Sequence, residues 1–240
     1  LGTGITTGTD NVAVGENALD ALTSGTDNTA IGDDALGLNT EGNNNTAVGA
    51  NALKTNSDGD GNTGLGRSAL ASSTTAGNNT AVGHNALQAT TTGASNTAVG
   101  REALEANTTA SNNVAVGYLA LTANTTGTDN VGVGMQALTA NTTGTDNTGI
   151  GDNALAANTT ANSNTALGSS ALAANTTGAR NIGIGMQALT DNTTANDNIA
   201  IGYRALYENT TGTLNVAVGR SAASANTVGG YNSAYGVYAL

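Results

Sequence analysis

The sequence predicts an all-β protein, a parallel β-solenoid of 14 coils of 17 residues with two short strands in each coil. Three observations predict this fold class. An asparagine recurs every 17 residues from Asn11 to Asn232, and a glycine stands four places after each of them. Between the two, β-branched residues alternate with alanine or glycine, which is typical of a strand. Because one such unit buries little surface alone, neighbouring units are expected to stack. We therefore expect residues 1–240 to form one β-solenoid repeat domain.

The composition favours a thin core and excludes several classes of function. The 240 residues include 34 glycines and no Phe, Trp, Pro or Cys. Without cysteine there are no disulfides and no thiolate chemistry. The net charge of −11 disfavours nucleic acid and anionic membranes as partners. No signal peptide and no long apolar run are present, so no membrane insertion is expected in this segment.

The repeat has the consensus N-[TV]-[AG]-[VIL]-G-x-x-A-L-x-A-N-T-T-[GA]-x-x. Alanine stands seven places after each repeat asparagine, from Ala18 to Ala239, and leucine eight places after it, with Ala223 as the exception. The string "TANTTGTDN" at 122–130 returns at 139–147. Each coil therefore repeats the same columns of residues.

The first strand of each coil is predicted at "NVAVG" (11–15) and its equivalents, such as "NIGIG" (181–185). Alternation places Val12 and Val14 on one face and Ala13 on the other. A second short strand is expected to hold Leu19 and the residue two places on. The glycine after the first strand and the Asn-Thr-Thr-Gly and Thr-Asp-Asn stretches are turn formers. Each coil is thus expected to run strand, turn, strand, turn.

The columns also predict an inside and an outside. The position five places after the asparagine accepts residues as different as Glu16, His84 and Met135, so it is expected to face solvent. The position two places after it admits only Ala or Gly. It lies opposite the aliphatic face, which is expected to stack inside the coil, so this position is expected to be outside. We expect a second chain to pack on this small-residue face. The candidate interface residues there are Ala13, Ala30, Ala47, Ala98, Ala115 and Ala200.

At "NTAVG", "NVAVG" and "NIAIG" the sequence resembles the repeats of trimeric autotransporter adhesin heads and of phage-type tail-fibre β-rolls. The resemblance implies a left-handed β-roll, three chains around one axis, and a place at the cell surface or in a virion fibre. The 17-residue coil is longer than most adhesin-head coils, and the neck, stalk, anchor and chaperone domains of that family are absent from this sequence. Hexapeptide and pentapeptide solenoids are alternatives that a 17-residue period suits poorly.

No catalytic, metal or cofactor site is predicted, so the protein is not expected to be an enzyme. The single histidine, His84, stands in the variable outward column without a partner at ligand spacing. Asp129 and Asp146 recur at the same place in adjacent coils, and we expect them to be solvated acidic residues of turns.

Seven Asn-Thr-Thr triplets match the N-glycosylation pattern, and the repeat itself accounts for their even spacing. The candidate sites are Asn107, Asn124, Asn141, Asn158, Asn175, Asn192 and Asn209.

The leading functional prediction is a structural or adhesive segment of an extracellular fibre. Its expected partners are copies of itself, as a homotrimer or an end-to-end filament, because Leu1 and Leu240 lie at nearly the same phase of the coil. A ligand-binding head for a surface glycan or protein is the alternative, and an ice-binding solenoid a third. Tyrosines that gather late in the chain are candidates for the ligand or the junction to a neighbour: Tyr203, Tyr207, Tyr231, Tyr235 and Tyr238.

Overall fold

A computed structural model describes residues 7–240 and divides the chain into two compact units, Leu1–Leu119 and Ala120–Leu240. Leu1, on which the predicted phase of the first coil rests, lies outside the described residues. Each unit contains seven strands of three residues. Residues 7–240 contain no helix.

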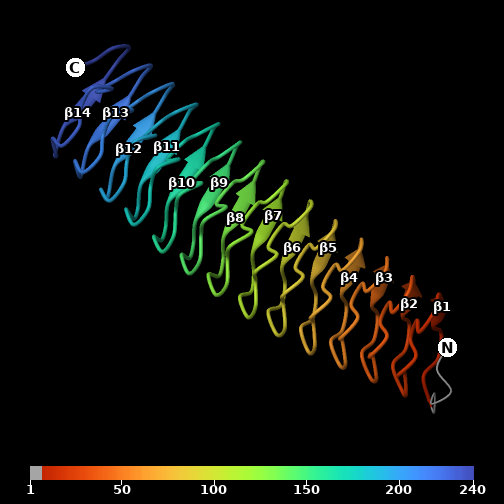
Figure 1. Cartoon of the computed structure of the whole chain (residues 1–240). Coiled ribbons are helices and arrows are strands. Elements are labelled where there is room, and N and C mark those ends of the chain that lie inside the picture. The colour runs from red at the N-terminus through yellow and green to blue at the C-terminus, as the bar shows by residue number, and fades with distance from the viewer. Residues whose placement is uncertain (1–6) are drawn as a thin grey trace. The chain divides into compact units, whose positions relative to one another are not determined.

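The strands recur 17 residues apart and pair in parallel within each unit (Figure 1). Val12 lies opposite Thr29 in the first unit, and Ile182 lies opposite Ile199 in the second. The predicted parallel β-solenoid is therefore confirmed in both units. The first unit holds β1 (Val12–Val14), β2 (Thr29–Ile31), β3 (Thr46–Val48), β4 (Thr63–Leu65), β5 (Thr80–Val82), β6 (Thr97–Val99) and β7 (Val114–Val116). The second holds β8 (Val131–Val133), β9 (Thr148–Ile150), β10 (Thr165–Leu167), β11 (Ile182–Ile184), β12 (Ile199–Ile201), β13 (Val216–Val218) and β14 (Ser233–Tyr235).

The second strand predicted in each coil is wrong. The segment after each strand glycine is a run of turns, and its leucine adopts a left-handed backbone, with φ of 49° at Leu36 and 53° at Leu189. A bulky residue rarely adopts this conformation, which costs about 1–2 kcal/mol. The leucine accepts it because its side chain is fully buried and its N–H reaches the next coil. Leu36 N–H, for example, donates to the carbonyl of Ala52 at 3.0 Å.

The position after each strand requires glycine for two reasons, its positive φ and the closeness of the next coil. At Gly66 φ is 135°, a region open to glycine and closed to other residues. A Cβ at this position would lie 2.6 Å from the carbonyl oxygen of Gly83 in the next coil. The glycine column therefore lets successive coils stack at strand spacing.

Hydrogen bonds join successive coils well beyond the strands. Val12 N–H donates to Asn28 at 2.8 Å on entering β1, and Gly32 N–H donates back to Val14 at 2.8 Å. Farther around the coil, Thr142 N–H donates to the carbonyl of Thr159 at 2.8 Å. Most of the backbone is thus paired with a neighbouring coil, although only three residues per coil are strand.

Candidate functional surfaces

The alanines predicted to form an interface lie inside the coil. Ala30, Ala47, Ala98, Ala115 and Ala200 have no exposed surface, and Ala13 in the first coil is half-buried. Their neighbour is the leucine of the preceding coil. At Gly64, which occupies the same column, a Cβ would lie 3.4 Å from Leu53 Cγ. The predicted interface on this column is therefore wrong, because the leucine fills the thin core and leaves room for Ala or Gly alone.

The opposite face of the strands points outward and carries the larger aliphatic side chains. Val12 is 50% exposed and Val14 57%. Isolated apolar side chains are common on surfaces, but a continuous run marks an interaction surface. We call the third strand position the aliphatic stripe, and each of its members is exposed or half-buried. The stripe comprises Val14, Ile31, Val48, Leu65, Val82, Val99 and Val116 in the first unit, and Val133, Ile150, Leu167, Ile184, Ile201 and Val218 in the second.

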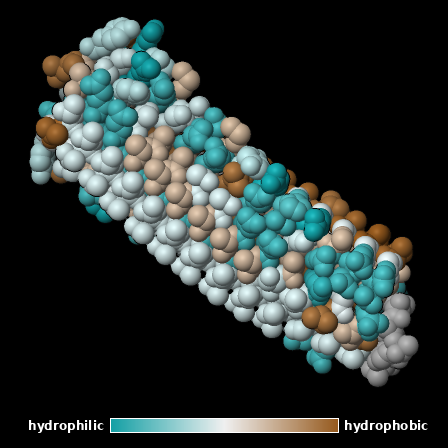
Figure 2. Space-filling view, in the orientation of Figure 1, coloured by the Kyte–Doolittle hydropathy of each residue, from teal (hydrophilic) through white to brown (hydrophobic). Residues whose placement is uncertain are grey.

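Figure 2 shows a row of hydrophobic residues along the part of the first unit where β2 to β6 lie. Sequence reasoning found the alternation that produces this row, but it assigned the row to the interior. The tertiary structure therefore moves the candidate interface from one face of the strand to the other.

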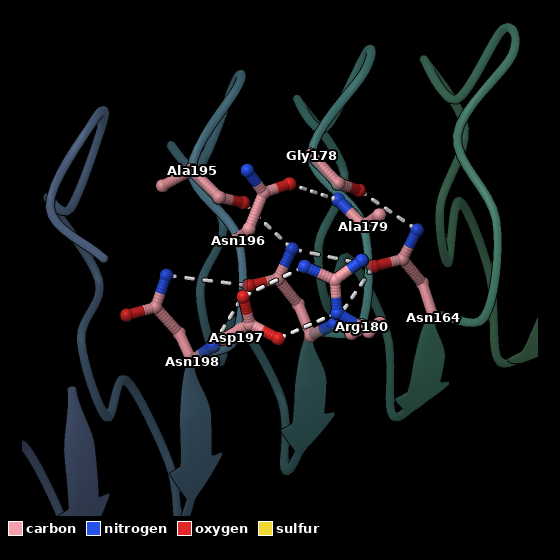
Figure 3. Close-up of polar contacts among 9 residues, drawn as sticks. Asn164, Gly178, Ala179, Arg180, Ala195, Asn196, Asp197 and Asn198 are labelled. Carbon is pink, nitrogen blue, oxygen red and sulfur yellow. Dashed lines mark hydrogen bonds and ion pairs between the residues drawn. The ribbon is translucent and has the colours of Figure 1, made fainter. Parts of the chain in front are cut away.

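The repeat asparagines form a ladder inside each unit, which we call the strand-side ladder. Asn164 Nδ2 donates to the carbonyl of Gly178 at 2.9 Å, and Asn164 Oδ1 accepts the backbone N–H of Asn181 at 2.9 Å (Figure 3). Asn198 repeats the pattern, donating to Gly212 at 2.9 Å. Each rung thus satisfies a turn carbonyl and the backbone of the next rung. The ladder's role is structural.

A second ladder, the turn-side ladder, stands eleven places after each repeat asparagine. In the second unit Asn158 Nδ2 donates to Asn141 Oδ1 at 2.8 Å and to the carbonyl of Ala161 at 3.1 Å. Among the described residues no buried side-chain nitrogen or oxygen lacks a hydrogen-bond partner. Both ladders are therefore fully satisfied polar cores.

The predicted glycosylation sites all belong to this turn-side ladder. Asn107, Asn124, Asn141, Asn158, Asn175, Asn192 and Asn209 have no exposed surface. The Nδ2 atom that would carry a sugar is bonded within the core, as at Asn158. In the folded chain, therefore, none of these amides is accessible for modification.

Three of the late tyrosines lie in a group with two arginines that sequence reasoning did not single out. The Arg204 guanidinium lies 4.8 Å from the Tyr207 ring centroid and 5.4 Å from that of Tyr203. The Arg220 guanidinium lies 5.7 Å from both the Tyr203 and the Tyr238 rings. We call these five residues the tyrosine–arginine cluster. The signal in the sequence was the Tyr203–Arg204 pair, with Arg220 in the column of Tyr203 one coil later and Tyr238 in the column of Arg204 two coils later.

The remaining predicted tyrosines lie outside these contacts. Tyr235 is 68% exposed and ends β14, while Tyr231 is 81% exposed in the preceding turn. Neither has an arginine over its ring among the described residues.

Three of the six basic residues are neutralised by a neighbouring carboxylate. Lys54 Nζ lies 2.7 Å from Asp34, and Arg101 lies 2.8 Å from Glu102. Arg180 and Asp197 form a bidentate pair with contacts of 2.6 and 2.8 Å (Figure 3). The hydrogen bond from Arg180 holds the pKa of the Asp197 carboxyl below its ordinary value of 3.8.

The described residues offer no constellation for metal chemistry. In residues 7–240 no group of three His, Cys, Asp or Glu side chains is placed to hold a metal ion. His84 is half-buried in the outward column, and Asp129 and Asp146 are exposed in their turns.

No protein-family model, curated protein or solved structure matches the chain. Within residues 7–240 there is also no helix with the length and apolarity that a membrane crossing requires.

Proposed function

We propose that the protein is a structural segment of an extracellular fibre, in which copies of the chain associate side by side through the aliphatic stripe. The observation that carries this proposal is the stripe itself, a column of exposed Val, Ile and Leu that runs across consecutive strands of a unit. Monomeric proteins seldom leave such a continuous apolar surface in water.

The arrangement of the stripe favours cyclic assembly. The stripe runs along the direction in which the coils stack. A rotational symmetry axis parallel to that direction would therefore bring the stripes of all copies together. Two or three parallel copies would then bury their stripes against one another. The resemblance to adhesin heads favours three, and the same resemblance supports a place at the cell surface or in a virion fibre.

A sedimentation experiment on the whole chain tests this assembly. The wild-type protein is expected to sediment as a homotrimer at micromolar concentration. Replacing two stripe residues by Val82→Lys and Val99→Lys places charges in the buried interface and should yield monomer. A matched control is Thr92→Lys with Thr109→Lys, which adds the same charges to exposed turn positions of the same two coils.

The control variant should remain trimeric, and circular dichroism should show both variants folded. A wild-type chain that stays monomeric at tens of micromolar would refute the proposal, as would stripe variants that associate like the control. Negative-stain images of the assembled protein then report whether it forms fibres.

A second candidate, ice binding, is favoured by one observation in the first unit. Beside the stripe stand five threonines in adjacent strands, and their hydroxyls make no hydrogen bond within the described residues. They are Thr29, Thr46, Thr63, Thr80 and Thr97. A regular array of hydroxyl and methyl groups can order water. A monomer that shows thermal hysteresis, lost on replacing Thr63 and Thr80 by Lys, would select this function over the fibre.

A further inference from the structure

The tyrosine–arginine cluster gathers the surface features of a ligand site on three successive coils of the second unit. Tyr203, Arg204 and Tyr207 belong to one coil, Arg220 to the next and Tyr238 to the third. Rings and guanidinium groups alternate in the order Tyr207, Arg204, Tyr203, Arg220, Tyr238, with separations of 4.8 to 5.7 Å. The coils are about 4.8 Å apart, so the cluster is an extended surface.

The two arginines of the cluster are free of carboxylate partners. Arg204 Nε donates to the amide oxygen of Gln187 at 2.8 Å, and neither Arg204 nor Arg220 forms an ion pair among the described residues. Arg101 differs: it also lies over a ring, that of Tyr118 at 5.7 Å, but Glu102 neutralises it. The cluster thus keeps two uncompensated positive charges.

The three coils that carry the cluster have a net charge of opposite sign to that of the whole chain. Residues 198–240 contain two arginines and a single acid, Glu208, whereas the chain as a whole carries −11. An anionic ligand therefore meets less repulsion at these coils than at the rest of the chain. Arginine also presents several N–H donors in a planar fork that matches a carboxylate.

We infer that the tyrosine–arginine cluster binds an acidic polysaccharide, with the arginines pairing to the carboxylates of uronic acid residues. Tyr207 and Tyr238, the rings at the two ends of the series, pack their arginine-free faces against the sugars. Sugar rings present flat arrays of C–H groups, and burying them on aromatic rings removes apolar surface from water. An acidic peptide would use the same arginines, but it has no such rigid faces for the two end rings. This inference concerns a different surface from the aliphatic stripe, and it holds for a monomer or an assembly.

Calorimetric titration of the whole chain with a short oligogalacturonate in calcium-free buffer tests the site. The wild-type protein is expected to bind, and Arg220→Gln should weaken binding about tenfold, because one charge-assisted pair is worth roughly 1.5 kcal/mol. Arg220 is exposed, and its guanidinium makes no hydrogen bond in the described part of the chain, so this change leaves folding intact. Tyr238→Ala should weaken binding by a similar factor, because it removes an exposed end ring that packs on a sugar face.

Matched controls separate the site from general charge effects. Arg67→Gln removes an exposed arginine with neither an ion pair nor an aromatic neighbour among residues 7–240, and Tyr231→Ala removes a tyrosine outside the cluster. Both should leave the affinity within twofold of wild type. Neutral oligogalactose of the same length should bind at least tenfold more weakly than oligogalacturonate.

Several results would overturn the inference. Absence of binding by the wild-type chain would do so, as would equal losses for Arg67→Gln and Arg220→Gln. Polyglutamate binding as tightly as oligogalacturonate would identify an acidic-peptide site instead. Stripe variants such as Val82→Lys with Val99→Lys retain the cluster. Titrating them with oligogalacturonate therefore tests the polysaccharide site independently of assembly.

Discussion

The turn-side ladder differs between the two units. In the second unit every rung is asparagine, and the Asn–Asn contacts at Asn158, Asn175 and Asn192 measure 2.8 to 3.0 Å. In the first unit Leu22, Ser73 and Thr90 replace rungs. The Ser73 hydroxyl reaches Asn56 only at 3.5 Å, at the limit of a hydrogen bond, and Asn107 reaches Thr90 at 3.2 Å.

This difference teaches that the coil does not depend on the ladder being complete. Both units have three-residue strands, a glycine after each strand and a column of buried leucines, with Ala223 as the exception in the second unit. The ladder adds hydrogen bonds to a path already fixed by those elements. Since stability in a solenoid is largely a sum over neighbouring coils, the second unit should be locally the more stable.

The largest effect is expected where the two units do not differ. Gly66→Ala in the first unit and Gly168→Ala in the second should each destabilise their coils by at least about 3 kcal/mol. At Gly168 φ is 134°, and the new Cβ would lie 2.7 Å from the backbone of Gly185. Hydrogen-exchange mass spectrometry of peptides around each site measures the loss. A loss of stability in only one of the two variants would contradict the conclusion that both units share the same coil backbone.

Removing a rung should affect the units unequally. Asn158→Ala leaves the amide oxygen of Asn141 without its donor and Asn175 Nδ2 without its acceptor on the preceding rung, which costs roughly 2–4 kcal/mol. Ser73→Ala removes one long hydrogen bond and should cost about 0.5–1 kcal/mol. Local hydrogen exchange compares the two variants. Equal losses would show that the complete ladder adds no stability.

Completing the ladder should bring the first unit closer to the second. Ser73→Asn places an amide between Asn56 and Thr90, where it can donate to Asn56 as Asn158 donates to Asn141. A gain of about 1 kcal/mol is expected. Chemical denaturation followed by peptide-resolved exchange reports it, with Ser72→Asn on the half-buried neighbour as the control. A destabilised Ser73→Asn variant would mean that this coil has no room for the amide.

Ion pairs should contribute least to stability, and their contribution should be similar in both units. Asp34 in the first unit and Asp197 in the second have pKa values lowered by hydrogen bonds from Lys54 and Arg180. A lowered folded pKa stabilises the protein above the ordinary value of 3.8, and this contribution disappears as pH falls through the lowered value. Stability measured from pH 5 to about pH 2 should fall slightly less in Arg180→Gln, and a large difference would contradict this ranking.

Much of the fold could be predicted from the sequence. The asparagine column fixed the 17-residue period and the register, so the pairing of Thr29 with Thr46 followed from their spacing. The strand at 12–14 followed from alternation, and the glycine after it from its need for positive φ. The predicted second strand failed because its leucines adopt a left-handed backbone, which local propensity disfavours for a bulky residue. Only burial and pairing with the next coil make that conformation stable.

The candidate surfaces could be predicted less well. The tyrosines were visible in the sequence, but Arg204 and Arg220 became part of the same group only when the coils were stacked. Which carboxylate neutralises which cation also depends on contacts between coils, as between Arg180 and Asp197.

The sequence by itself determined the period, the parallel register and the division of each strand into a small-residue face and an aliphatic face. Only the tertiary structure decided which of these faces is inside. Alternation defines two faces of the strand but does not say which of them is buried. Hydrophobicity alone favours burying the face with the larger side chains. The coil is too narrow to hold both its leucine and a valine, so the leucine of the turn occupies the core beside Ala or Gly. The valines and isoleucines therefore remain on the outer face.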